Sequence, residues 1–431
     1  MGKKEPTDTW EVTVGSALRQ KIAQLQGRLA RHDWAQERRR LAFALVCGLL
    51  CGLANIVLCR SVSWIGELWR AFPWMSALLP ALGLLEIVLY QALCLPMNLT
   101  PGFDSLIDSM KSRRRFPVRE GIGVFLGTLM SLAGGASVGP DSASKHLGAS
   151  VGTLLLPWFS LKEDDGEPAW AWACACGLAA CFSALLCAPL GVFAYLVEHL
   201  HAHRITLRHL PAVLLSCLIA AAFARPLNQQ LATPYVGVQE AAPVDLWAVC
   251  LVAAACAAAG ACFGAGVRCL ELVRDKLGRS PAKCLPTGAV LVALALLLIP
   301  GLAAWAGLGT QLVSPALAHA QPSWGFAYKL LLTIVCLGFG LRGGEVTVVF
   351  VVGALLGSSI AGLLGASPLI CGALAMVALY GVALNSPVSG MFIGCEFFGW
   401  GFAPWIVPCV AAAYGLRRVV GRLLPFRSLT L

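Results

Sequence analysis

The sequence predicts an all-α polytopic membrane protein, built from two inverted-topology repeats with helices that cross only part of the bilayer. The 431 residues are 58% hydrophobic and only 13% charged, with a mean hydropathy of +0.76. Such a chain has too few polar residues to cover the surface of a water-soluble fold. Several apolar segments are shorter than the roughly 20 residues of a full span. Spacings of glycine, proline and glutamate also recur in the two halves of the chain.

The first 40 residues are polar and charged, which does not fit a signal peptide. The apolar residues Leu18, Ile22, Leu25 and Leu29 recur at helical spacing. This pattern predicts an amphipathic helix on the inner membrane surface, with a partly ordered tail as the alternative.

Basic residues set the expected orientation of the chain. The net charge is +10, and the basic clusters are Arg38–Arg40, Lys111–Arg119, Arg204–Arg208, Arg268–Lys283 and Arg417–Arg427. The positive-inside rule assigns all of them to the cytoplasmic side. We therefore expect a multi-pass protein of a bacterial inner membrane with a cytoplasmic N-terminus. Because each cluster flanks an apolar segment, we expect no nucleic-acid partner.

Apolar segments divide the chain into short units. They are 41–60, 73–97, 118–133, 143–158, 168–187, 189–200, 209–225, 243–275, 285–305, 325–341, 346–364, 368–384, 387–398 and 402–416. Glycine clusters separate several of them, which predicts irregular backbone at membrane depth. Such backbone persists only where protein or water satisfies it, usually around a transported species.

An internal repeat relates the two halves. Glycines stand at offsets 0, +9 and +13 in each half, at Gly139, Gly148 and Gly152 and again at Gly344, Gly353 and Gly357. A proline also precedes a glutamate by nine residues twice, at Pro189 and Glu198 and at Pro387 and Glu396. We expect a cytoplasmic segment over 1–40, repeats over 41–225 and 243–425, a linker over 226–242 and a tail over 426–431. A substrate site is expected between the repeats, near the midplane.

The two glycine-led segments indicate the kind of substrate. Each begins after a loop and continues as an apolar helix, so each helix N-terminus is expected inside the protein. Free N–H groups and the positive end of the helix dipole then point inward from both repeats. Facing helix N-termini form an anion site, so the sequence predicts an anionic cargo.

Three motifs resemble the chloride-channel (CLC) family of anion channels and proton-coupled exchangers. They are "GPDSA" at 139–143, "CAPLGVFAYLVE" at 187–198 and "GLRGGEVTVVFVVGALLG" at 340–357, and the likeness extends over about 41–425. "GGEVT" at 343–347 and "GVALNSPVSGMFIGCEFFG" at 381–399 are similar to the fluoride-exporting clade, although Val348 replaces a proline. The resemblance implies a homodimer, formed by helices within 189–225 and 387–414. Each subunit then moves chloride or fluoride, either alone or in exchange for protons.

The resemblance also implies which residues form the site. It gives Asp141 the place of the family's gating glutamate, although an alternative register puts Val138 there. Glu345 is expected to relay protons or to cap its helix, and His199 replaces a second proton-carrying glutamate. The expected anion-binding residues are Gly139, Pro140, Ser142, Gly344, Val346 and Thr347, together with Thr100 and Gly102 from the first loop.

Other roles remain open for the charged residues of these segments. Asp141 could serve only as a helix cap. Lys145 lies one turn after Asp141 and could pair with it, add positive potential for an anion, or extend to the membrane interface. Glu198 and Glu396 occupy equivalent places, which favours a shared structural task such as holding loop backbone.

Other function classes find little support in the sequence. No nucleotide-binding loop, catalytic triad or metal-hydrolase motif is present, so we expect neither an enzyme nor a cofactor or metal centre. The 18 cysteines lie mostly within apolar runs, where they act as small apolar side chains. The alternatives to a CLC-type pathway are a transporter for another small anion on a different inverted-repeat fold, and an inactive membrane scaffold.

Overall fold

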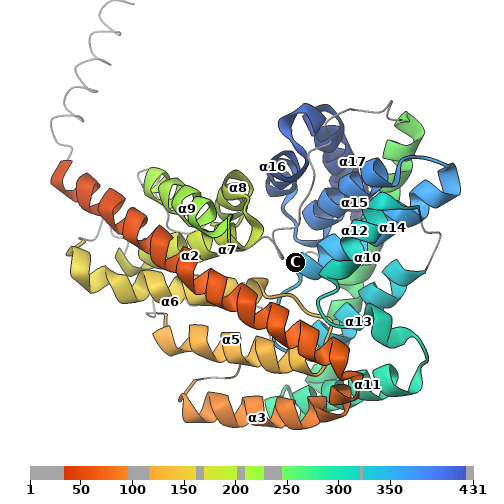
Figure 1. Ribbon diagram of the computed structural model, residues 1–431, viewed down its shortest axis with the longest axis horizontal. Helices are drawn as coiled ribbons and strands as arrows, with labels where there is room; N and C mark the ends of the chain where they lie inside the picture. Colours follow the sequence, from red (N-terminus) through yellow and green to blue (C-terminus); the bar gives the residue numbers. More distant parts are fainter. Residues whose placement is uncertain are drawn as a thin grey trace, which may run out of the picture.

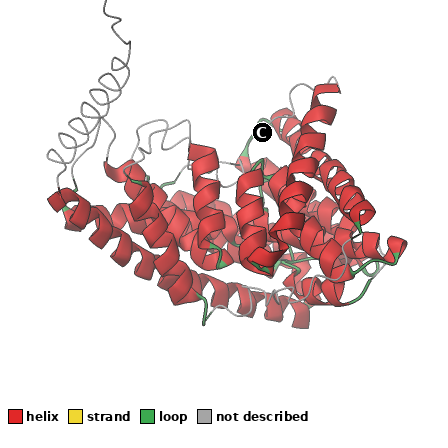
Figure 2. Cartoon of the chain, turned by 90° about the horizontal axis from the view of Figure 1, so that it is seen from above, coloured by secondary structure: helices red, strands yellow, loops and turns green. Residues whose placement is uncertain are grey.

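The structure is a computed structural model that describes residues 34–95, 97, 99, 116–161, 169–200, 209–227, 245–320 and 324–423. Every extended regular element in these ranges is helical (Figure 2). The longer helices are α2 (Trp34–Ala71), α3 (Leu79–Ala92), α5 (Val118–Ala133), α6 (Asp141–Phe159), α7 (Ala169–Leu186), α8 (Pro189–Leu200), α9 (Leu210–Ala224), α10 (Leu246–Lys276), α11 (Pro281–Leu298), α13 (Gly325–Gly338), α14 (Val346–Leu364), α15 (Pro368–Ala383), α16 (Pro387–Phe398) and α17 (Ala403–Leu423). The shorter ones are η1 (Pro73–Leu78), η2 (Leu302–Trp305), η3 (Thr310–Leu312), α12 (Val313–Ala318) and η4 (Trp400–Phe402).

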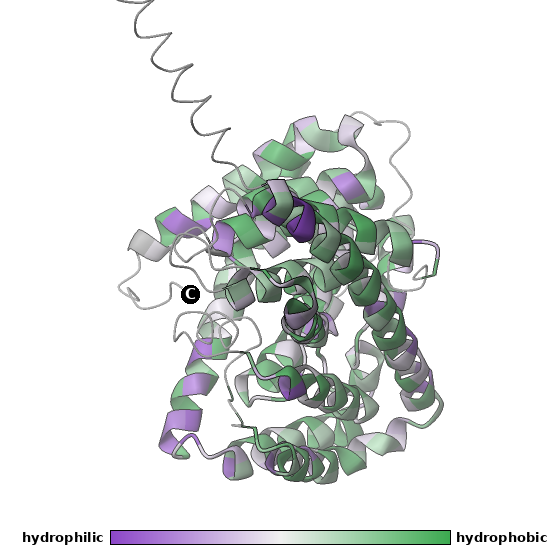
Figure 3. Cartoon of the chain, turned by 90° about the vertical axis from the view of Figure 1, so that its left-hand side faces the viewer, coloured by the Kyte–Doolittle hydropathy of each residue, from purple (hydrophilic) through white to green (hydrophobic). Residues whose placement is uncertain are grey.

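The membrane character follows from the helices themselves. Within the described ranges, six helical segments are long and apolar enough to cross a membrane. The helices are largely hydrophobic along their length, as the green colouring of Figure 3 shows. α8 and α16 have only 12 residues each, so each is shorter than a full span. Full and partial spans therefore coexist, as the sequence predicts.

The helix boundaries agree with the sequence in some places and not in others. The predicted segments 189–200, 346–364 and 387–398 coincide with α8, α14 and α16. The prediction was wrong for α2, which extends well beyond 41–60 at both ends. Near the start of α2, Glu37 and Arg40 form an ion pair at 3.1 Å one turn apart. Such a pair stabilises a helix, so the helix continues through this charged segment. The amphipathic helix expected over residues 18–29 lies outside the described residues.

The helices form two equivalent sets. α2, α3 and α5–α9 lie on the left of Figure 1, and their counterparts α10, α11 and α13–α17 lie on the right. Contacts recur within the sets, because α6 packs on α7 as α14 packs on α15, and α2 packs on α9 as α10 packs on α17. The sets meet where α8 packs against α16 and α3 against α11. This arrangement confirms the two predicted repeats.

The junction of α8 and α16 shows that the repeats are inverted. The Glu198 carboxylate, near the end of α8, accepts hydrogen bonds from the N–H groups of Val388 and Ser389 at the start of α16 (2.8 and 3.0 Å). The Glu396 carboxylate in turn accepts from the N–H groups of Leu190 and Gly191 at the start of α8 (2.9 and 2.8 Å). The two helices are therefore antiparallel, and each glutamate caps the other repeat. The shared structural task predicted for the two glutamates is confirmed.

The repeated glycine spacing has a packing cause. A Cβ atom at Gly148 would lie 2.2 Å from the Gly177 carbonyl oxygen, and one at Gly152 would lie 2.0 Å from the Ala173 oxygen. In the second repeat, a Cβ at Gly357 would lie 2.3 Å from the Cys371 oxygen. Glycine is thus required where α6 crosses α7 and where α14 crosses α15, because the backbones touch.

Replacing Gly152 by alanine should lower the stability of the protein by about 1–3 kcal/mol, because the new methyl group has no room against the α7 backbone. Thermal unfolding of the detergent-solubilised protein measures this effect. Gly415→Ala is the matched control, because a Cβ there meets nothing within 4 Å. In the α17 helix it should leave stability unchanged or raise it slightly. Equal melting temperatures for the two variants would contradict the close crossing.

Candidate functional site

The loops that precede α6 and α14 meet at the contact between the repeats. The Gly139 N–H donates to the Gly344 oxygen, and the Gly344 N–H donates to the Gly139 oxygen, both at 2.7 Å in an antiparallel bridge. α6 begins two residues after Gly139, and α14 begins two residues after Gly344. The prediction that the two helix starts converge is confirmed.

Both helix starts leave backbone donors free of side-chain caps. The first bonds within the turns run from Ser144 N to Pro140 O and from Val349 N to Glu345 O, each at 2.9 Å. Among the described residues, neither N-cap residue, Pro140 for α6 or Glu345 for α14, caps its helix through a side-chain hydrogen bond. The N–H groups of the first turns therefore add positive potential from both repeats at one buried place. Such a pair of helix starts can bind an anion.

The predicted anion-binding residues divide into two groups. Pro140 forms the N-cap position of α6, while Ser142, Val346 and Thr347 lie buried in the first turns. Gly139 and Gly344 use their N–H groups on each other, so in this structure they hold the helix starts together and do not offer donors. Thr100 and Gly102 lie outside the described residues.

Asp141 is the first residue of α6 and is fully buried. Within the described part of the chain, neither of its carboxylate oxygens accepts a hydrogen bond. A Cβ at Gly344 would lie 1.9 Å from Asp141 Oδ2, so the carboxylate lies directly over the backbone of the second loop. The predicted alternative of a simple helix cap does not describe this side chain, because α6 has no side-chain cap.

Lys145 lies one turn further along α6 and points into the protein. Its Nζ atom lies 3.8 Å from Asp141 Oδ2, and the side chain is only 1% exposed. The ammonium group also lies over the rings of Phe182 and Tyr195, 4.7 and 5.1 Å from their centroids. The alternative in which Lys145 extends to the membrane interface is therefore wrong, and the distance to Asp141 is that of an ion pair, one of the two other roles left open by the sequence.

The other two expected proton-carrying groups lie on different helices. Glu345 is the N-cap residue of α14, next to Gly344, but its side chain does not cap that helix. His199 lies in the last turn of α8. Its Nδ1 atom is 2.9 Å from the Tyr195 carbonyl oxygen, and its Nε2 atom is 3.5 Å from the Ser386 hydroxyl. Only Glu345 is thus brought to the helix starts with Asp141.

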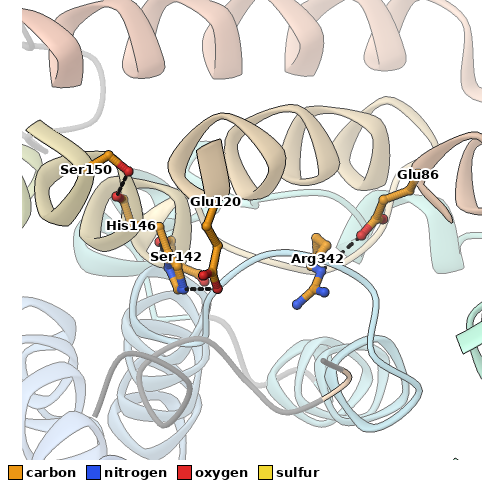
Figure 4. A network of polar contacts seen from close by, with 6 residues as sticks. All are labelled: Glu86, Glu120, Ser142, His146, Ser150 and Arg342. Atoms are coloured by element: carbon orange, nitrogen blue, oxygen red, sulfur yellow. Dashed lines mark hydrogen bonds and ion pairs between the residues drawn. The ribbon is translucent and has the colours of Figure 1, made fainter. Parts of the chain in front are cut away.

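A buried ion pair fastens the second loop to the first repeat (Figure 4). Arg342, two residues before Gly344, donates from Nε to Glu86 Oε1 on α3 at 3.0 Å. The guanidinium carbon also lies 4.8 Å from the centroid of the Tyr90 ring. Because the Glu86 side chain is 1% exposed, the pair is shielded from solvent and fixes the approach to α14.

A histidine on α6 continues the polar cluster in Figure 4. His146 Nδ1 lies 2.8 Å from the Ser142 carbonyl oxygen, which can only accept, so this nitrogen carries the proton. The other ring nitrogen lies 3.8 Å from Glu120 Oε1 on α5. Sequence reasoning singled out neither Glu86 nor Arg342. The available signal was a charged residue within or beside an apolar segment.

Comparison with known proteins assigns the family. The sequence profile of the voltage gated chloride channel family matches residues 82–418. The chain belongs to this family. A family relative named chloride/fluoride channel protein, from Pseudomonas syringae pv. tomato, is 28% identical over 390 residues, covering 86% of this chain and 83% of the relative.

Solved structures show the voltage gated chloride channel fold. A CLC-type fluoride/proton antiporter superposes with a TM-score of 0.80 at 22% identity, over 90% of this chain and 98% of its own. A slow cyanobacterial Cl⁻/H⁺ antiporter superposes with a TM-score of 0.75 at 17% identity, over 91% of this chain and 98% of its own. A eukaryotic CLC transporter superposes with a TM-score of 0.72 at 16% identity, over 88% of this chain and 72% of its own. These similarities exclude the alternative of a different inverted-repeat fold.

Proposed function

We propose that this chain carries a halide, chloride or fluoride, across a bilayer through a pathway at the Gly139–Gly344 bridge of each subunit. The observation that carries the proposal is the meeting of two uncapped helix starts in the protein interior. The fully buried side chains of Val138, Val346 and Val348 border them. Apolar walls with a few backbone donors suit a small monatomic anion better than an organic one.

The relatives support this choice of cargo. The bacterial relative is named a chloride/fluoride channel protein, and two solved neighbours are described as halide/proton antiporters. Exchange of a halide for protons needs a group that takes up a proton at the anion site. Asp141 lies there as a buried carboxylate over Gly344, in the place where an anion would contact the second helix start.

We assign the gate to Asp141 on this geometry. Its negative charge competes with a halide for the same positive potential, and protonation removes that competition. Val138, the alternative gate, packs against Gly343 and carries no titratable group. Glu345 is next to the bridge and serves as a second proton site. His199 serves as a proton donor toward the end of α8.

The orientation proposed for the chain follows from its basic residues. Arg38–Arg40 lie at the start of α2, and Arg274 and Lys276 lie at the end of α10. Because α2 and α10 are equivalent helices of inverted repeats, the start of one and the end of the other reach the same membrane face. The positive-inside rule makes that face cytoplasmic. We propose a bacterial inner membrane location, with the repeats over about 41–225 and 243–425 and the first turns of α2 preceding the first boundary.

We further propose a homodimer through α8, α9, α16 and α17. Large apolar side chains are exposed on these helices, among them Leu218, Phe392 and Val407. In a dimer, each subunit keeps its own pathway, because the Gly139–Gly344 bridge joins loops of a single chain.

Halide efflux from proteoliposomes tests the proposed function. Vesicles containing the purified protein are loaded with chloride or fluoride, and halide release and external pH are recorded together. We expect release of at least one halide well above that of protein-free vesicles, with protons moving against the halide flux. Halide release with no proton signal would indicate a channel. Release of neither halide would identify an inactive scaffold and refute the proposal.

A further inference from the structure

Lys145 stands out as a buried cation on the same helix as the gate. Its side chain is 1% exposed and lies among residues of three helices, namely Asp141 on α6, Phe182 on α7 and Tyr195 on α8. Transferring an ammonium group from water to such a place is costly unless counter-charges and ring faces compensate for it.

Lys145 and Asp141 form an ion pair without a hydrogen bond between them. The 3.8 Å between Nζ and Oδ2 is too long for a hydrogen bond. The two Asp141 oxygens accept no hydrogen bond from any described residue, although the side chain is fully buried. A buried carboxylate held only by a nearby charge can leave that charge more easily than one fixed by several donors.

We propose that Lys145 is an anion-binding residue of the pathway, and that the transported halide replaces the Asp141 carboxylate as its counter-ion. This inference rests on the proposed function, because it adds a binding residue to the same site. The charges balance in each state. When the Asp141 carboxylate is ionised, its negative charge compensates the Lys145 ammonium group. When the carboxylate is protonated from the aqueous phase, one halide compensates the ammonium group instead. The site therefore holds one halide for each proton on Asp141, and the two can arrive from opposite sides of the membrane.

The position of Lys145 also extends the pathway. The helix starts at the Gly139–Gly344 bridge supply partial charges from the backbone. Lys145 supplies a full charge one turn along α6, on the side where Tyr195 of α8 contributes its ring. A halide that leaves the bridge toward α8 thus meets a second positive group before it reaches His199.

Halide binding by the purified, full-length protein tests the inference. Titration calorimetry with sodium chloride and sodium fluoride measures the affinity of the wild type and of single variants. Lys145→Met removes the charge at similar length and should weaken binding by at least about tenfold, whereas Lys145→Arg should stay within about threefold. Lys329→Met is the matched control, because Lys329 is another fully buried lysine and lies on α13. It should also bind within about threefold of the wild type.

A double-variant cycle separates the role of Lys145 from a general loss of structure. Asp141→Asn frees Lys145 from its carboxylate and should tighten halide binding by about tenfold in the wild-type background. The same change should have no effect in the Lys145→Met background. The double variant removes both charges, so it leaves no unpaired buried ion, and a wild-type gel-filtration profile verifies its fold.

The outcomes distinguish the two proposals. Unaltered affinity in Lys145→Met, or equal tightening by Asp141→Asn in both backgrounds, overturns the role of Lys145 while the proposed halide transport stands. Loss of affinity in Lys329→Met equal to that in Lys145→Met also overturns it. A wild-type protein that neither binds nor releases any halide refutes both.

Discussion

Replacing Asp141 by alanine should abolish proton movement while halide flux continues. Coupled proton flux is expected to fall by about 100-fold or more, because alanine removes the carboxylate that lies over the backbone of the second helix start. Halide efflux should persist, since alanine leaves the backbone donors of α6 and α14 in place and removes a competing negative charge. Simultaneous recording of halide and pH in proteoliposomes measures both quantities.

Asp141→Glu serves as the matched control for this result. Glutamate keeps the carboxylate and lengthens the side chain by one methylene, so proton coupling should be retained. Unchanged coupling in Asp141→Ala would remove Asp141 from the gate role and direct attention to Glu345. Loss of coupling in both variants would show that the position of the carboxylate matters as much as its presence.

Replacing Arg342 by methionine should destabilise the protein by about 3–5 kcal/mol, because it leaves the Glu86 carboxylate buried without its partner. The Glu86 side chain is 1% exposed and that of Arg342 is 12% exposed, so little solvent can compensate. Halide flux should fall as well, because Arg342 holds the loop that carries Gly344. Unfolding of the solubilised protein and efflux from vesicles measure the two effects.

Two further variants calibrate this expectation. Glu86→Gln combined with Arg342→Met removes both charges and should recover part of the lost stability. Arg279→Met breaks an ion pair with Asp275 whose side chains are 77% and 40% exposed, and it should change the melting temperature little. If the Arg342→Met and Arg279→Met variants have the same melting temperature, the buried ion pair does not stabilise the loop.

Part of the fold could be predicted because its causes are local. Proline fixes the starts of α8 and α16 at Pro189 and Pro387, where the sequence placed them. The repeated glycines marked the helix crossings, because only glycine lets the backbones approach as at Gly148 and Gly177. The convergence of the two helix starts followed from the repeat itself.

The remaining features depend on contacts between distant parts of the chain. Arg342 and Glu86 are 256 residues apart, and no spacing rule joins them. The environment of Lys145 comes from Phe182 and Tyr195 on other helices, so its burial could not be read from α6 alone. The N–H groups of Gly139 and Gly344, expected to be free for an anion, instead donate to each other's carbonyl oxygens. This bridge depends on how the two repeats pack, so the sequence could not predict it.

The reciprocal bonds between the repeats limit how the protein can change access. The Gly139–Gly344 bridge and the paired caps of Glu198 and Glu396 join the halves at two places. A rocking motion of one half against the other would strain these bonds in every cycle. The moving element is therefore expected to be a single side chain, which swings while the surrounding helices stay still.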